Sequence, residues 1–244
     1  MLHFVTVATR EHPMLELLQS TLAKKKYTLD ILGLEMNKKI GWEAHGNLGL
    51  KLKLFCEYIH LPKLEKDDIV IYLDAYDVIF AGTKDILLER FQKFQTPIVF
   101  GAETSCFPNE LENRYPLSTS GFPFRYLNSG LCIGKVWALR ECFIDYIYED
   151  SINDQYWWKL KFLERPDLID LDYTNTLFLN CNGVDKNSIQ LENDIISYNK
   201  KHPQVLHFNG TSKAIMNRYA KLDPNPYYLF SGATKESYIL YGGE

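Results

Sequence analysis

The sequence has few cysteines and no marked excess of charge of either sign. Its 244 residues include 5 cysteines, none of them in a C-x-x-C pair or another metal-ligand spacing. So few cysteines, and an odd number of them, argue against a disulfide framework, although one bridge is compatible with this number. They favour a protein of a reducing compartment. The 27 basic and 31 acidic residues give a net charge of −4, so we expect no nucleic-acid partner.

Long apolar runs and several common sequence motifs are also absent. No stretch approaches the roughly 20 apolar residues of a membrane-spanning helix, and "MLHFVTVAT" enters a strand pattern without a preceding signal peptide. We therefore expect a soluble protein without membrane contact, in the cytoplasm of the host or producing cell. The sequence contains no G-x-x-x-x-G-K-[ST], G-x-G-x-x-G or G-x-S-x-G, which argues against P-loop NTPases, Rossmann dehydrogenases and α/β-hydrolases.

The composition is that of a globular protein with many aromatic residues. Hydrophobic residues make up 46% and aromatic residues 14%, which suits a packed core and stacking surfaces for planar or sugar-like ligands. The first hundred residues alternate between strand and helix patterns, as in an α/β fold with a mostly parallel sheet flanked by helices. The expected strands are 2–9, 27–34, 69–74 and 97–103, and the expected helices are 13–25, 50–59 and 83–94.

The second half of the sequence is less regular. Helices are expected at 136–148 and 154–163, and strands at 124–134, 168–173, 176–181 and 204–210. We find no linker and no internal repeat. The sequence therefore predicts one domain, residues 1–244, with a nucleotide-binding half (1–103) and a second half (104–244) whose strand order it does not fix.

Two aspartates lie at the end of the apolar strand "IVIYLD" and in the turn after it. Asp74 ends it and Asp77 lies in the next turn, at the sheet edge where open α/β proteins bind ligands. Two carboxylates there could share a hard divalent cation, although helix capping or a turn role is the more common reason for an isolated D-x-x-D. Asp170 and Asp172 form a rival D-x-D on a strand, and their less apolar surroundings favour a structural or acceptor-side role.

Three further polar groups interrupt apolar sequence. His207 ends a strand in "VLHFNGTSK", where the imidazole could join a metal shell and Lys213 could face a phosphate. The Asn128–Ser129–Gly130 loop could approach a ligand closely or be a plain bulge. Asp154 begins an aromatic helix, where it could favour the helix N-terminus or reach a sugar hydroxyl.

Six segments taken together resemble the glycosyltransferase domain of collagen lysyl hydroxylases. In chain order they are "TVAT", "LDAYDVIFAG", "FGAETSCFP", "RYLNSGLCIG", "NDQYWW" and "LHFNGTSK", and the similarity covers residues 3–219. That domain transfers glucose from UDP-glucose to galactosyl-hydroxylysine. The resemblance implies a stand-alone transferase of GT-A fold, dependent on Mn²⁺ and retaining anomeric configuration, with a collagen-like or other glycosylated acceptor.

The resemblance also implies roles for individual residues. It places Asp74, Asp77 and His207 at the metal, and Asp154, Asn128 and Lys213 at the site of the reaction. The donor-site residues that it implies are Thr6, Val7, Ala8 and Thr9 around the uridine, Lys51 and Tyr76, and Asn209, Gly210 and Lys213 beside the diphosphate.

Three departures from the family pattern leave the sugar and the acceptor open. The acidic run before the glutamine is only "DSIND", the NSGG loop ends in Leu131, and Phe107 replaces a tryptophan over the pocket. A hydroxylysine galactosyltransferase, a UDP-sugar transferase with another acceptor, and an inactive UDP-sugar-binding module are the alternatives. The sequence does not fix the oligomeric state, and a homodimer is one option.

Overall fold

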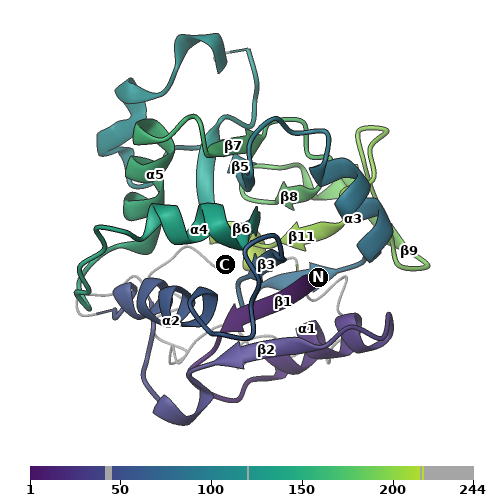
Figure 1. Cartoon of the computed structure of the whole chain (residues 1–244). Coiled ribbons are helices and arrows are strands. Elements are labelled where there is room, and N and C mark those ends of the chain that lie inside the picture. Colours follow the sequence, from purple (N-terminus) through teal and green to yellow (C-terminus); the bar gives the residue numbers. More distant parts are fainter. Residues whose placement is uncertain (42–45, 120, 215, 217–244) are drawn as a thin grey trace, which may run out of the picture.

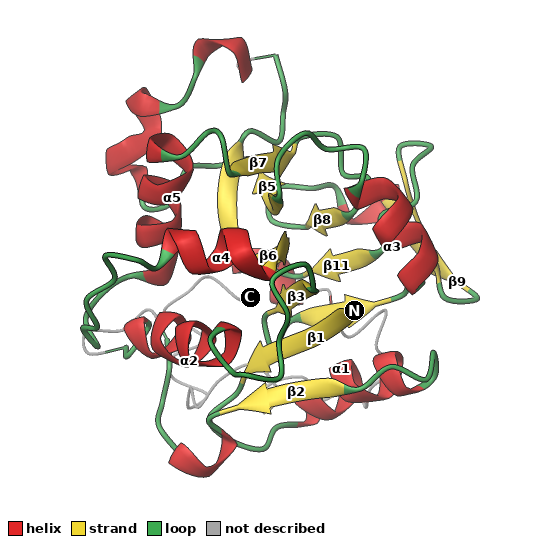
Figure 2. Cartoon of the chain, viewed as in Figure 1, coloured by secondary structure: helices red, strands yellow, loops and turns green. Residues whose placement is uncertain are grey.

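The computed structural model describes residues 1–41, 46–119, 121–214 and 216. The last residues of the proposed similarity, 217–219, lie outside these ranges. A six-stranded sheet runs through the centre of the molecule in the order β2-β1-β3-β6-β5-β7 (Figure 2). Its strands are β1 (Leu2–Val7), β2 (Leu29–Leu32), β3 (Ile69–Leu73), β5 (Ile98–Glu103), β6 (Tyr126–Lys135) and β7 (Ile169–Asp172).

Five of these six strands share one direction. β1 pairs in parallel with β2 and β3, and β5 pairs in parallel with β7. β6 alone is antiparallel to both of its neighbours, β3 and β5. The predicted α/β fold with a mostly parallel sheet is thus confirmed, and the strand expected at 124–134 proves to be the antiparallel member.

Alternate residues of the strands build a core on each face of the sheet. Val5, Val70 and Ile98 belong to a core shared with α2 (Gly49–Ile59), α4 (Val136–Cys142) and α5 (Asp154–Glu164), which lie together along one side (Figure 1). Phe4 and Ile71 pack on the opposite face with α1 (Pro13–Ala23) and α3 (Lys84–Phe91). Because both faces are covered, the central strands are continuous apolar runs.

Side-chain caps mark the starts of α1 and α5. Pro13 stands at the start of α1, where the His12 ring accepts a hydrogen bond from the Met14 amide at 3.2 Å. The Asn153 side chain caps α5 by accepting from the Tyr156 amide at 3.0 Å. The helix expected at 136–148 is wrong in its second half, because α4 ends at Cys142. Beyond it the Phe143 ring stacks on Trp157, with ring centroids 4.7 Å apart, so aromatic packing replaces helical periodicity there.

A second, three-stranded sheet has the order β4-β11-β8 and carries part of the candidate site. Its strands are β4 (Val78–Phe80), β8 (Phe178–Asn180) and β11 (Val205–His207). β11 is antiparallel to β4 and parallel to β8, with His207 opposite Val78 and Asn180. The turn that contains Asp77 is thereby fixed beside His207.

The remaining elements are short. β9 (Ile189–Glu192) and β10 (Ile195–Tyr198) form a hairpin. The 3₁₀ turns are Leu34–Met36, Asn109–Arg114, Leu117–Thr119, Lys186–Ser188 and Gly210–Ser212. Within the described ranges, no helix has the length and apolar character needed to cross a bilayer.

Candidate active site

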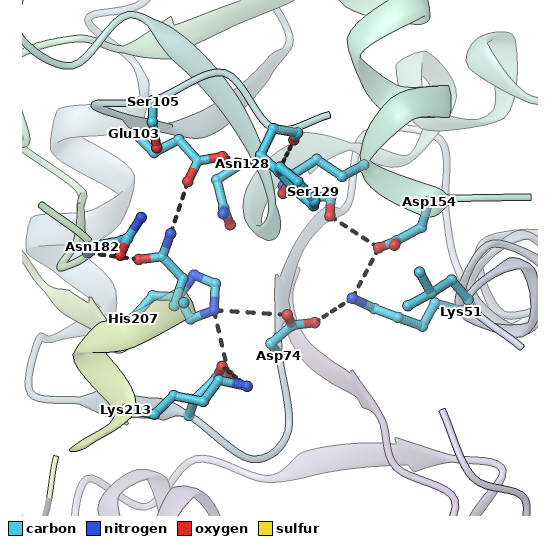
Figure 3. A pocket seen from close by; sticks show the side chains of 16 residues that line it. Lys51, Asp74, Glu103, Ser105, Asn128, Ser129, Asp154, Asn182, His207 and Lys213 are labelled. Atoms are coloured by element: carbon cyan, nitrogen blue, oxygen red, sulfur yellow. Dashed lines mark hydrogen bonds and ion pairs between the residues drawn. The ribbon is translucent and has the colours of Figure 1, made fainter. Parts of the chain in front are cut away.

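Asp74, Asp77 and His207 meet at one point between the two sheets. Asp74 follows β3, Asp77 precedes β4, and His207 ends β11. One ligand atom from each lies within 4.8 Å of the others, with His207 Nε2 3.3 Å from Asp77 Oδ1 and 3.7 Å from Asp74 Oδ2 (Figure 3). Asp77 and His207 are buried and Asp74 is partly exposed. The arrangement offers two carboxylates and one imidazole to a single cation.

The hydrogen bonds of His207 suit a metal ligand. Asn180 Nδ2 donates to the Ala102 carbonyl, so the Asn180 oxygen faces His207 Nδ1 at 2.8 Å. In a neutral imidazole this bond places the proton on Nδ1 and directs the Nε2 lone pair at the two carboxylates. A divalent cation between them would compensate the negative charge of the two carboxylates and accept the imidazole lone pair, so the donor set fits a divalent ion.

Space around this cluster depends on Gly130. A Cβ added at position 130 would overlap the His207 ring at Cε1 and lie 2.7 Å from Asp74 Oδ2. The amide of Asp74 also donates to the Gly130 carbonyl at 2.8 Å. The Asn128–Ser129–Gly130 segment is therefore part of β6 and brings bare backbone against the cluster.

Two lysines flank the cluster. Lys213 Nζ lies 3.0 Å from Asp77 Oδ2. Burial alone would raise the pKa of Asp77, but Lys213 and His207 hold it well below its usual range. On the other side, Lys51 Nζ lies 2.8 Å from Asp74 Oδ1 and 2.9 Å from Asp154 Oδ2. Burial opposes the charge of Lys51, yet these two carboxylates raise its pKa well above the ordinary value.

Asp154 is buried at the first position of α5. Its Oδ2 accepts from Ser129 Oγ at 2.9 Å as well as from Lys51, and the Ser129 amide donates to Gln155 Oε1 at 3.2 Å. Asp154 is thus linked to Asp74 through one lysine (Figure 3). The predicted sugar-pocket residue and the predicted cation site share a single ion-pair network.

Glu103, at the end of β5, is a site residue that the sequence analysis missed. Its carboxylate accepts from Gln155 Nε2 at 3.0 Å and from Asn209 Nδ2 at 2.9 Å. Burial raises its pKa to about 7, against the opposing pull of Lys159. The argument applied to Asp74, a carboxylate ending an apolar strand at the ligand edge, could have found it.

These side chains surround a cavity of about 280 Å³. Most of the predicted site residues line it, together with Glu103, Ser105, Phe107, Gln155 and Asn182. The full lining is Leu48, Lys51, Asp74, Asp77, Glu103, Ser105, Phe107, Asn128, Ser129, Asp154, Gln155, Asn182, His207, Asn209, Gly210 and Lys213.

The residues expected around the uridine are not among those that line this cavity. Thr6, Val7, Ala8 and Thr9 are buried at the end of β1, where the Thr9 hydroxyl donates to the Lys38 carbonyl. Tyr76 donates to the Arg10 carbonyl at 3.1 Å. Among the described residues, the buried Thr6 hydroxyl has no hydrogen-bond partner. The donor-site role of Thr6, Val7, Ala8, Thr9 and Tyr76 stays a prediction.

The rival D-x-D has a structural role. Asp172 is buried and accepts the amides of Thr176, Leu177 and Phe178 at 2.9, 2.6 and 3.0 Å, which organises the connection from β7 to β8. Asp170 accepts from the Leu171 amide at 2.7 Å. Neither carboxylate lines the cavity.

The chain is similar to known proteins over nearly its whole length. Residues 1–231 match the family model described as the PLOD GT domain. A procollagen-lysine,2-oxoglutarate 5-dioxygenase of Drosophila melanogaster is 35% identical over 184 residues, covering 70% of this chain and 25% of the relative. A Caenorhabditis elegans protein named multifunctional procollagen lysine hydroxylase and glycosyltransferase is 30% identical over 228 residues, covering 87% and 31%. The chain thus spans about a quarter to a third of these relatives.

A solved structure supports the fold. The glycosyltransferase involved in glycosylation of the major capsid of PBCV-1 aligns with a TM-score of 0.50 at 11% identity, covering 91% of this chain and 99% of that one. The expected GT-A fold and the resemblance to the glycosyltransferase domain of collagen lysyl hydroxylases are both confirmed. This chain belongs to the PLOD GT domain family and is a glycosyltransferase.

Proposed function

We propose that this domain binds a UDP-sugar through Mn²⁺ held by Asp74, Asp77 and His207, and transfers its hexose to an acceptor hydroxyl. The donor most consistent with the family is UDP-glucose, and the acceptor is galactosyl-hydroxylysine of a collagen-like protein. The observation that carries the proposal is the convergence of two carboxylates and an imidazole within 4.8 Å, beside a cavity of about 280 Å³.

The charges around the cavity suit a diphosphate. When bound, a divalent cation supplies Lewis-acid assistance to the leaving diphosphate. Lys213, 3.0 Å from Asp77, places a second positive charge on the same side of the cavity. Asn209 and Gly210 line the cavity together with Lys213 and present polar groups to the diphosphate.

The opposite part of the cavity suits a sugar. Asp154 is held by Lys51 and Ser129, so its carboxylate is fixed in orientation. There it can accept from a sugar hydroxyl and stabilise the positive charge that develops on the anomeric carbon. Asn128 is held in turn by the Gly130 amide, which donates to its side-chain oxygen at 2.9 Å.

Retention of configuration needs no side-chain base in this arrangement. The acceptor hydroxyl would attack the anomeric carbon from the face of the leaving group, while the bond to the phosphate oxygen breaks. That phosphate oxygen takes the hydroxyl proton. Asp154 then acts by orientation and charge rather than as a nucleophile.

The cation site is tested by replacing Asp77 with alanine. Asp77→Ala removes one ligand and the ion-pair partner of Lys213, so we expect loss of turnover and of Mn²⁺-dependent UDP binding in calorimetry. Asp145→Asn, at an exposed position outside the cavity, is the control and should bind like the unmodified chain. Mn²⁺-dependent UDP binding that survives in Asp77→Ala would overturn the assignment.

The donor and the acceptor are separated by a UDP-release assay. UDP-glucose, UDP-galactose and other UDP-sugars are compared with Mn²⁺, with and without a galactosyl-hydroxylysine peptide. A transferase slowly hydrolyses its own donor without acceptor, whereas an inactive UDP-sugar-binding module releases no UDP. Preference for UDP-galactose and a plain hydroxylysine peptide would indicate the galactosyltransferase alternative.

A further inference from the structure

Lys159 places an amine in the interior of the protein. It lies on α5, one turn after Gln155, and its side chain is 0% exposed. A buried ammonium group requires hydrogen-bond acceptors because it has lost its water. Lys159 Nζ donates to the Phe107 carbonyl at 2.7 Å, and it lies 3.4 Å from both the Pro108 carbonyl and Cys106 Sγ. Every one of these partners belongs to the segment 106–108.

This segment forms part of the cavity wall. Phe107 lines the cavity, and the residue is 57% exposed. Its carbonyl also accepts from Gln155 Nε2, so two side chains one helical turn apart hold the backbone of a single residue. Gln155 also donates to Glu103, which lies across the cavity from Lys213 (Figure 3). Two side chains of α5 therefore fix this part of the cavity wall.

An apolar side chain would fill the position of Lys159 without the desolvation cost of a buried charge. Burial does lower the pKa of this amine, while Cys106 and Glu103 oppose that effect. The hydrogen bonds that compensate for burial go to the backbone around Phe107. The geometry thus connects the amine to the placement of an aromatic ring and not to the general packing of the helix.

We propose that Lys159 is a positioning residue for sugar binding, which holds segment 106–108 so that Phe107 presents its ring to a pyranose in the cavity. Aromatic rings stack on the apolar face of a pyranose, whether that sugar belongs to the donor or to the acceptor. This inference rests on the proposed function for the identity of the ligand. The ligands of the cation come from other elements, so Lys159 acts on the sugar and not on the binding of Mn²⁺ and UDP.

The test compares Lys159→Met with Lys161→Met, a matched control on the same helix whose amine is paired with Glu164 at 3.6 Å. Loss of a charged hydrogen bond predicts an increase of about tenfold in KM for the affected substrate, with kcat little changed. KM for UDP-glucose hydrolysis and KM for the galactosyl-hydroxylysine peptide are measured separately, so the substrate affected is identified. UDP affinity in the presence of Mn²⁺ should be unchanged in both variants.

A double-mutant cycle separates positioning from a purely structural role. If Lys159 acts through Phe107, Lys159→Met should add little to KM in a Phe107→Ala background. An equal effect in both backgrounds, or an unchanged KM in Lys159→Met, would overturn the inference. Should Lys159→Met not fold, Lys159→Gln retains a donor and is measured in the same way.

Amide hydrogen exchange gives a readout that does not require turnover. Exchange of residues 104–107 should accelerate in Lys159→Met and stay unchanged in Lys161→Met. If the unmodified chain turns over no UDP-sugar, the proposed function fails while this exchange result still tests the placement of the segment. Unchanged exchange in Lys159→Met would contradict the positioning role directly.

Discussion

Glycine is a steric requirement at position 130. A methyl group there would contact both the His207 ring and Asp74 Oδ2, so Gly130→Ala must displace two of the three candidate cation ligands. Changes to the groups that surround and orient metal ligands reduce metal affinity by about 10- to 100-fold. We expect Mn²⁺-dependent UDP affinity, measured by calorimetry, to fall by that factor with the fold retained. Gly121→Ala is the matched control, since a Cβ at Gly121 meets no atom within 4 Å among the described residues.

Glu103 should make stability depend on pH. Its pKa is about 7 in the folded protein, raised from the ordinary 4.5 mainly by burial. The folded state therefore keeps a proton that the unfolded chain loses. The associated stability is fully present below about pH 4.5 and is lost as the pH rises through about 7, amounting to about 3 kcal/mol.

The variant Glu103→Gln removes this titration. Urea unfolding of metal-free protein at pH 5 and pH 8 should show that the unmodified chain loses more stability over this range than Glu103→Gln. Other carboxylates contribute equally to both proteins and cancel in the difference. Parallel pH dependence in the two proteins would show that Glu103 is ionised throughout.

Among the elements, those with long apolar patterns were predicted well. The strand expected at 69–74 is β3, and the helix expected at 50–59 is α2 with one more residue at its start. The sequence did not reveal β4, because its three residues follow the strand at 69–74 closely within the same apolar stretch, so they do not stand out as a separate strand. β4 became a strand only through pairing with β11, which is a contact between distant segments.

We predict that Asp172 stabilises the connection between β7 and β8 and does not bind a metal. Its carboxylate accepts three backbone amides, two of them fully buried hydrogen bonds. Asp172→Ala leaves these donors without a partner, so we expect the free energy of unfolding to fall by about 2–4 kcal/mol. Urea denaturation measures the loss, and Asp170→Ala, which removes one hydrogen bond to the adjacent amide, is the milder control.

Affinity of Mn²⁺ and UDP for folded Asp172→Ala should match that of the unmodified chain. A selective loss of Mn²⁺ binding in Asp172→Ala, without loss of stability, would make Asp170 and Asp172 candidate metal ligands again.

At the scale of the whole molecule, the sequence pointed to the candidate cation ligands but not to the residues that hold the cavity wall around Phe107. The position of Asp74 and Asp77 after an apolar strand pointed to a ligand site, because open α/β sheets bind ligands at the ends of their strands. The family resemblance then grouped His207 with them. Lys159 could not be found in this way. It lies within a helix, and its hydrogen bonds to the backbone of segment 106–108 arise only from the packing of α5 against that segment. Phe107 was noted as a departure from the family pattern, without any indication of what holds it.

The candidate site joins both halves of the sequence, so its ligands should stabilise the whole fold. Asp74 and Asp77 come from the first half and His207 from the second, and all three line one cavity. A ligand at 100 times its Kd stabilises the folded state by about 2.7 kcal/mol, which for a chain of this size raises Tm by about 5–10 °C. We expect this increase, measured by differential scanning calorimetry, with Mn²⁺ and UDP together, and its reversal by a chelator. The same increase in Asp77→Ala would show that the ligands bind elsewhere.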